Sequence, residues 1–181
     1  MSSERLQLSF FSPATQYYVT GRFGVLAGQM PVAGNLLHHA IEMYIKGALA
    51  KTMSLKQLKG LFHSLPDLWT TFKAESYDTS SASFDTLITS LHTFEELRYP
   101  DSSLTRGMAV TAGITRGASV GLSAKPEIVS VPTYEIYLDE IDALVGHIFK
   151  VASINPVFFI SKLNARPREY LRENNSQPWA T

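Results

Sequence analysis

The chain has 181 residues, of which 45% are apolar and 18% are charged, and it contains no cysteine. This length fits one domain spanning residues 1–181, and the lack of cysteine excludes disulfides, thiolate zinc sites and cysteine nucleophiles. Sixteen basic residues balance sixteen acidic ones, so no overall field draws the protein to nucleic acid or anionic lipid, although a local basic patch stays open.

The N-terminus lacks the charged and then apolar pattern of a signal peptide. No apolar run approaches the roughly 20 residues that are needed to cross a bilayer. We therefore expect a soluble, cytoplasmic protein with no membrane partner.

The first helix is predicted to start at Ser12-Pro13, with Ser as the N-cap and Pro at the first helical position, and to run to about Gln29. Three glycines share one side of it at spacings of three and four, namely Gly21, Gly24 and Gly28. A phosphate loop would place its glycines between a strand and a helix. We therefore expect these glycines to allow a close helix–helix contact.

The second helix is predicted over Val32 to Lys51. Its apolar residues share one half of the helical wheel: Ala33, Leu37, Ala40, Ile41, Tyr44, Ile45 and Ala48. A polar stripe occupies the other half: Asn35, His38, His39, Glu42 and Lys46. Glu42 and Lys46 have the order and spacing of a helical ion pair, and an exposed pair is the favoured interpretation. The alternative is that the stripe faces a neighbouring helix or subunit and organises a site there.

The histidines do not predict a metal site. His38 and Glu42 could share an ion, but one pair is short of the three or four ligands that a site requires. His63, near Asp67, is expected to have a structural role at a break between helices, because no partner for acid–base catalysis is evident.

Two further helical regions are predicted before residue 101. One covers Leu55 to Ala74 and is interrupted near Ser64, because Pro66 disfavours helical geometry just before it. The next runs from Ser80 to Arg98, and its inner face carries Phe84, Leu87, Ile88, Leu91 and Phe94.

Residues 102–132 are rich in Gly, Ser, Thr and Val and predict an irregular or β-hairpin insertion with short extended pieces, such as residues 108–111. The last long helix is predicted over Tyr134 to Ile154, with Asp139, Asp142 and Lys150 facing water. A short apolar helix over Val157 to Leu163 precedes a polar tail, residues 164–181, which we expect to be frayed or held by a partner.

Basic residues gather in and just before the insertion, where few carboxylates oppose them. They are Arg98, Arg106, Arg116 and Lys125. Converging guanidinium groups make bidentate contacts with phosphate or carboxylate. These four residues are the candidate anion-binding site.

Several motifs together resemble the HEPN family, a group of small all-α domains found mainly in prokaryotes. The second helix carries an Ala-x-Glu-x-x-Ile-Lys line, with Ala40, Glu42 and Lys46 in the family positions. A His-x-Leu-x-x-Leu line follows from His63, and Leu97-Arg98-Tyr99-Pro100 resembles the family's helix end before its final helix. The resemblance covers about two thirds of the chain.

The resemblance implies an all-α, antiparallel up-and-down bundle of about five helices, with the insertion before the last long helix. It also implies a homodimer, and many such proteins are ribonucleases, toxins or partners of nucleotidyltransferases. The family's nuclease site is an Arg followed by His after four to six residues. Here the late-helix His147 is preceded at those spacings by Asp142, Ile141 and Glu140, and these cannot replace the positive charge at a phosphate.

We therefore expect a non-catalytic, homodimeric binding or interaction module, without a cofactor or catalytic residues, that takes an anion or nucleotide at a dimer groove near Arg98, Arg106 and Arg116. Two alternatives stay open. One is a divergent ribonuclease that uses another Arg/His pair brought together by folding, with His63 or His147 as the histidine, and the other is a structural component of a toxin–antitoxin or defence complex.

Overall fold

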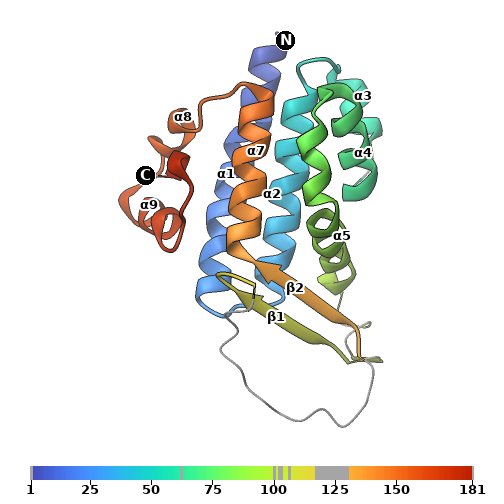
Figure 1. Ribbon diagram of the computed structural model, residues 1–181, viewed down its shortest axis with the longest axis vertical. Helices are drawn as coiled ribbons and strands as arrows, with labels where there is room; N and C mark the ends of the chain where they lie inside the picture. The colour runs from blue at the N-terminus through green and yellow to red at the C-terminus, as the bar shows by residue number, and fades with distance from the viewer. Residues whose placement is uncertain are drawn as a thin grey trace.

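The chain folds into a mostly helical structure with one small sheet (Figure 1). The computed structural model describes residues 2–61, 63–99, 101, 104–105, 107–116 and 131–180. The α-helices are α1 (Ser3–Leu26), α2 (Val32–Leu49), α3 (Leu55–Gly60), α4 (Leu65–Ser76), α5 (Asp85–Thr93), α7 (Leu138–Ala152), α8 (Val157–Ile160) and α9 (Ala165–Arg172). Short 3-10 helices are η1 (Thr79–Phe84), η2 (Phe94–Arg98) and η3 (Pro178–Ala180), and the strands are β1 (Ala109–Gly113) and β2 (Thr133–Tyr137). The expected helical class is confirmed at this level.

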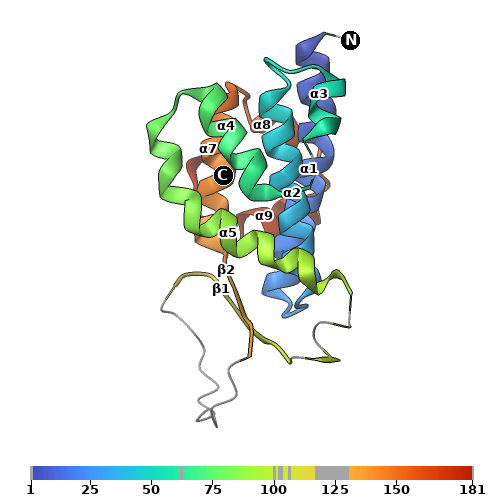
Figure 2. The ribbon, with the colours of Figure 1, turned by 90° about the vertical axis from the view of Figure 1, so that its right-hand side faces the viewer.

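Helix α2 is the centre of the bundle. It packs against α1, α4, α5, α7 and η2, so that neighbours cover most of its circumference (Figures 1 and 2). The predicted apolar stripe is confirmed, because all seven of its residues are buried. A helix that is covered on nearly all sides must also bury part of its polar stripe, and this property creates the candidate site.

Helix α1 starts earlier than the sequence predicted. Its N-cap is Ser2, whose side chain accepts from the Arg5 amide, and Pro13 lies inside the helix. Pro in a helix interior costs about 3 kcal/mol. Leu6 and Phe11 precede this proline and are buried in the core, and burying two such side chains contributes about 1.5–3 kcal/mol each. Packing therefore outweighs the local signal that placed the helix start at Ser12.

Gly21 and Gly24, two of the three glycines that share one side of the predicted first helix, allow α1 and α2 to approach closely. A Cβ on Gly21 would lie 2.7 Å from Leu37 Cγ, and a Cβ on Gly24 would lie 2.8 Å from Ala33 Cβ. The prediction of a close helix–helix contact is confirmed for these two. Gly28 lies beyond the end of α1 with φ +69°, where it serves the turn instead.

The middle helices follow the prediction closely. The break near Ser64 separates α3 from α4, and Ser64 caps α4 by accepting from the Asp67 amide. The region predicted as one helix from Ser80 to Arg98 is continuous but changes character, from η1 through α5 to η2. Its inner residues Leu87, Ile88, Leu91 and Phe94 are buried.

The extended piece predicted at residues 108–111 overlaps β1, but β1 pairs in parallel with β2 and does not form a hairpin with it. Residues 117–130 of the predicted irregular or β-hairpin insertion lie outside the described residues. Ala109 lies opposite Thr133 and Gly113 opposite Tyr137. Parallel strands need a long crossover connection, and in the sequence a long segment separates Gly113 from Thr133. The last helix consequently starts at Leu138, since Thr133–Tyr137 forms β2 at the end of the bundle (Figure 1).

The C-terminal segment packs against its own chain. Leu171 and Ala180 are buried, and the Trp179 ring lies 5.9 Å from the Phe149 ring. Arg22 of α1 donates to the backbone carbonyl of Tyr170 at 3.4 Å and to that of Glu173. The expectation of a frayed tail is therefore wrong for residues 164–180, whereas its contact with a partner stays a prediction.

The position of Asp142 also differs from the prediction. The sequence placed it facing water, but its carboxylate is buried against the Arg22 guanidinium and the Tyr18 hydroxyl. This buried ion pair between Arg22 and Asp142, which the sequence did not predict, links α1 to α7.

Within the described part of the chain, no helix has both the length and the apolar character that a bilayer crossing requires.

Candidate functional site

The charged pair on α2 lies inside the protein. Glu42 is 3% exposed and Lys46 is 8% exposed, and Lys46 Nζ lies 2.8 Å from Glu42 Oε1. The favoured interpretation of an exposed pair is wrong. The alternative, in which the stripe faces neighbouring elements, is confirmed, because α4, α5 and η2 pack on α2.

Two histidines complete a cluster on the same carboxylate. His63 Nδ1 lies 2.9 Å from Glu42 Oε1, and His39 Nδ1 lies 3.4 Å from Glu42 Oε2. We call Glu42, Lys46, His39 and His63 the Glu42 cluster. Burial on its own raises the pKa of Glu42, but hydrogen bonds and charge from His39, Lys46 and His63 outweigh burial and lower this pKa to about 2. The carboxylate is therefore ionised at neutral pH.

His63 connects the buried Glu42 carboxylate to the protein surface. Its side chain is 66% exposed although its Nδ1 contacts a buried carboxylate. An ionised carboxylate accepts hydrogen bonds, so Nδ1 is the donor, and in the neutral form of the ring Nε2 is then the acceptor. His63 lies in the break between α3 and α4 that the sequence predicted, and its contact with Glu42 fixes the orientation of the imidazole ring.

A pocket of about 350 Å³ opens beside the cluster. We call it the α2–η2 pocket; its polar and aromatic lining comes from Tyr17 of α1, from Asn35, His38 and His39 of α2, and from Arg98 of η2. The Tyr17 and His39 rings meet edge to face, with centroids 4.6 Å apart. Because His39 belongs to both, the pocket and the Glu42 cluster form one continuous site.

Arg98 supplies the permanent positive charge of this pocket. Its side chain is half exposed, and Nη1 lies 3.4 Å from Glu95 Oε1. Burial lowers the pKa of His38 to about 4, so His38 is neutral at pH 7. The pocket therefore combines the Arg98 guanidinium with the neutral His38 imidazole, the Asn35 amide and the Tyr17 ring.

The predicted anion-binding residues are not all brought together. Arg116 lies 2.8 Å from Glu140 and 2.9 Å from Glu135, with its guanidinium 4.6 Å from the centre of the Tyr137 ring. It lines a different pocket from Arg98. Arg106 and Lys125 lie outside the described residues. Only Arg98 therefore joins the candidate site among the described members of this set.

Three other residues that the sequence singled out, Ala40, Tyr99 and His147, lie outside the candidate site. Ala40 is in the core, and Tyr99 is 72% exposed directly after η2. His147 is held inside, with Nε2 2.8 Å from Ser81 Oγ and 3.1 Å from Asp78 Oδ2. These contacts give His147 a structural role that joins α7 to η1.

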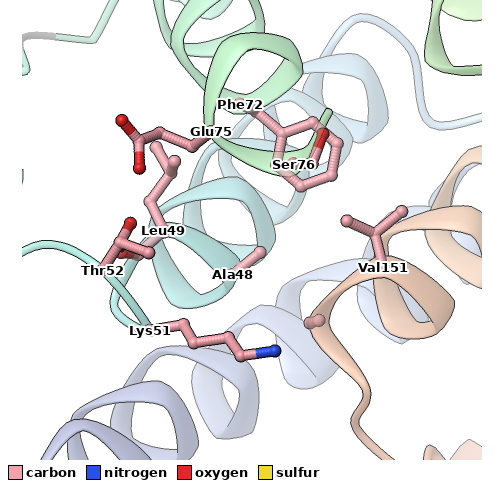
Figure 3. A pocket seen from close by; sticks show the side chains of 9 residues that line it. Ala48, Leu49, Lys51, Thr52, Phe72, Glu75, Ser76 and Val151 are labelled. Carbon is pink, nitrogen blue, oxygen red and sulfur yellow. The ribbon is translucent and has the colours of Figure 1, made fainter. Parts of the chain in front are cut away.

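A smaller pocket of about 190 Å³ lies at the other end of α2, where α4 and α7 approach it (Figure 3). Its floor is apolar, and the charged ends of Lys51 and Glu75 lie at opposite edges (Figure 3). It offers no converging set of polar groups. The α2–η2 pocket is the better candidate site.

Most residues of the site were predictable from the sequence, but Tyr17 was not, since an aromatic residue on a helix gives no sign of which pocket it borders. The predicted residues are Asn35, His39, Glu42, Lys46, His63 and Arg98.

No protein-family model, no curated protein and no solved structure matches this chain. The function is therefore inferred from the geometry of this site and from the motif resemblance.

Proposed function

We propose that this protein is a HEPN-like binding module whose α2–η2 pocket takes a phosphate-bearing ligand such as a nucleotide. One observation carries the proposal: Arg98, His39, Asn35 and the Tyr17 ring line the same pocket of about 350 Å³. A guanidinium pairs with phosphate through parallel N–H donors, and an aromatic ring offers a surface for a base. The volume lies within the roughly 300–1,000 Å³ range of ligand pockets.

The resemblance adds a homodimer and a nucleotidyltransferase-like or other protein partner to this proposal. Val32 at the pocket rim is 60% exposed and Tyr17 is 36% exposed. These apolar groups at the border of the pocket support the idea that a second copy completes a groove there.

Binding of a fluorescent ATP analogue, followed by anisotropy at fixed salt, tests the pocket. We expect Arg98→Ala to weaken binding by about 10- to 150-fold, because a charge-assisted contact to phosphate contributes roughly 1.5–3 kcal/mol. The matched control is Arg116→Ala, which removes an arginine already paired with Glu135 and Glu140 and should leave affinity unchanged. Equal losses in both variants, or no binding by the wild type, would contradict the proposal.

A second candidate, a divergent ribonuclease, is favoured by one specific contact. The buried Glu42 carboxylate orients His63 through Nδ1, and the exposed ring edge then presents Nε2. A histidine oriented in this way by a carboxylate is the usual arrangement of a general base. His63, rather than the enclosed His147, is the residue that could meet a substrate.

The test is cleavage of a fluorescently labelled single-stranded RNA. If the ribonuclease proposal holds, His63→Gln should reduce the rate about 100-fold, since general acid–base catalysis contributes roughly 10²–10⁴. His147→Gln, which changes the enclosed histidine between α7 and η1, is the control and should retain the rate, with far-UV circular dichroism verifying its fold. No cleavage by the wild type would leave the binding-module proposal alone.

A further inference from the structure

Two histidines and a glutamate meet between α2, α5 and η2, next to the α2–η2 pocket. His38 comes from α2, His92 from the last turn of α5, and Glu95 from η2. One ligand atom of each lies within 4.8 Å of the other two. In the sequence, His38 has only Glu42 as a nearby ligand on its own helix, which is too few for a site; the fold brings His92 and Glu95 beside His38 instead.

Both facing imidazole nitrogens are buried and have no hydrogen-bond partner. These atoms are His38 Nε2 and His92 Nδ1. The His38 side chain is only 6% exposed, and although the His92 side chain is 36% exposed, its Nδ1 is turned inward. Buried polar atoms are nearly always satisfied, so two unsatisfied nitrogens that face the same carboxylate indicate a missing partner between them.

The spacing identifies the kind of partner. Glu95 Oε2 lies 4.0 Å from His38 Nε2 and 3.6 Å from His92 Nδ1. These separations are too long for direct hydrogen bonds. Ligand atoms that each lie about 2.0–2.2 Å from a tetrahedral ion are themselves roughly 3.3–3.6 Å apart. A small inward adjustment would therefore place all three around one ion.

We propose that His38, His92 and Glu95 bind a divalent transition-metal ion of the zinc class. Two imidazoles and one carboxylate are borderline ligands that suit such ions better than Ca²⁺ or Mg²⁺. The other oxygen of the carboxylate, Glu95 Oε1, lies 3.4 Å from Arg98 Nη1, and such an outer contact orients a ligating carboxylate. This site stands independently of any nucleotide in the pocket.

The Glu42 cluster is a poorer metal site, although it also contains two histidines. Lys46 Nζ lies 2.8 Å from Glu42 Oε1, so an ammonium group already occupies the position where a cation would bind. At His38, His92 and Glu95, Arg98 contacts Glu95 Oε1, whereas both histidines face Glu95 Oε2. Charge therefore favours the His38 site over the Glu42 cluster.

Calorimetric titration of Zn²⁺ into the tag-free, full-length protein, first treated with a chelator, tests the site. We expect one equivalent to bind, and His92→Ala and Glu95→Gln each to weaken binding at least tenfold. His63→Ala removes a histidine of the Glu42 cluster and should leave Zn²⁺ affinity unchanged. At a free Zn²⁺ concentration of 100 times Kd, the wild-type Tm should rise by about 5–10 °C, and the Tm of the first two variants should not.

Both variant positions are partly exposed, so both proteins should fold, and their far-UV circular dichroism verifies it. The Glu95→Gln variant keeps the side-chain shape and serves if His92→Ala does not fold. No Zn²⁺ binding by the wild type would overturn the proposal and indicate a bridging water instead. Equal binding by the wild type and Glu95→Gln would also overturn it.

Discussion

Replacing Asp142 by alanine is expected to lower the free energy of unfolding by about 3–5 kcal/mol, because it leaves a buried guanidinium without its counter-charge. Arg22 is fully buried, and Asp142 is 1% exposed. The Tyr18 hydroxyl donates to the same carboxylate, so the substitution also removes the acceptor of a second buried group. Urea denaturation at pH 7 measures the loss.

The matched control is Lys150→Ala on the same helix. The sequence placed both residues on the water-facing side, but Lys150 is exposed whereas Asp142 is buried. A surface substitution of this kind changes stability by no more than about 0.5 kcal/mol. A loss below about 1 kcal/mol in Asp142→Ala would show that Arg22 finds another partner.

A double variant separates charge from packing. Arg22→Met combined with Asp142→Leu removes both charges and keeps apolar volume, which should recover part of the stability lost in Asp142→Ala. Full recovery is not expected, because Arg22 also donates to the backbone carbonyls of Tyr170 and Glu173. The shortfall measures how strongly Arg22 holds the C-terminal segment on the bundle.

Apolar periodicity predicted the central helices well. The stripe on α2 depends only on helical geometry and on burial of apolar groups, and every residue in it is buried. The break at Ser64 was also predictable, since Pro66 acts on its immediate neighbours and Ser64 caps the next helix. Such local causes can be read from the residues themselves.

Strand β2 shows a local signal that was present but assigned to a helix. Thr133–Tyr137 consists largely of β-branched and aromatic residues, and Tyr134 and Ile136 alternate inward with low exposure. That two-residue period is typical of a strand. The parallel partner β1 could not be predicted in the same way, because pairing depends on where the crossover returns.

The buried charges could not be predicted from local pattern. A carboxylate on an amphipathic helix is usually solvated, and Arg22 reaches Asp142 only because the fold brings α1 beside α7. The same limit applies to Arg98 and Arg116. Charge counting grouped them, but Glu135 and Glu140 already pair with Arg116, whereas Arg98 faces the pocket.

Glu42→Gln is expected to lower the free energy of unfolding by about 3 kcal/mol at pH 7, and this loss should fade in acid. The folded protein lowers the pKa of Glu42 from 4.5 to about 2. The unfolded chain therefore takes up a proton first as pH falls. The stabilisation is fully present well above pH 4.5, is more than half lost by pH 3, and disappears below about pH 2.

Urea denaturation of the wild type and Glu42→Gln at pH 7, 5, 4 and 3 measures this dependence. Glutamine resembles the protonated glutamic acid in shape and charge, so the two proteins should converge as pH falls. Glu75→Gln changes an exposed glutamate on α4 and should differ from the wild type by no more than about 0.5 kcal/mol at every pH. A difference between wild type and Glu42→Gln that stays constant from pH 7 to pH 3 would mean that the Glu42 charge does not stabilise the fold.

Lys46→Met identifies which partner holds this charge. It removes the ammonium 2.8 Å from Glu42 Oε1 but leaves His39 and His63 in contact with the carboxylate. Because the remaining partners lower the pKa of Glu42 less, the acid-induced loss of stability should be smaller and should end at higher pH than in the wild type, although it still begins near the pKa of Glu42 in the unfolded chain. An unchanged acid transition would instead mean that His39 and His63 keep Glu42 ionised without help from Lys46. The main role of this buried carboxylate would then be to orient His63.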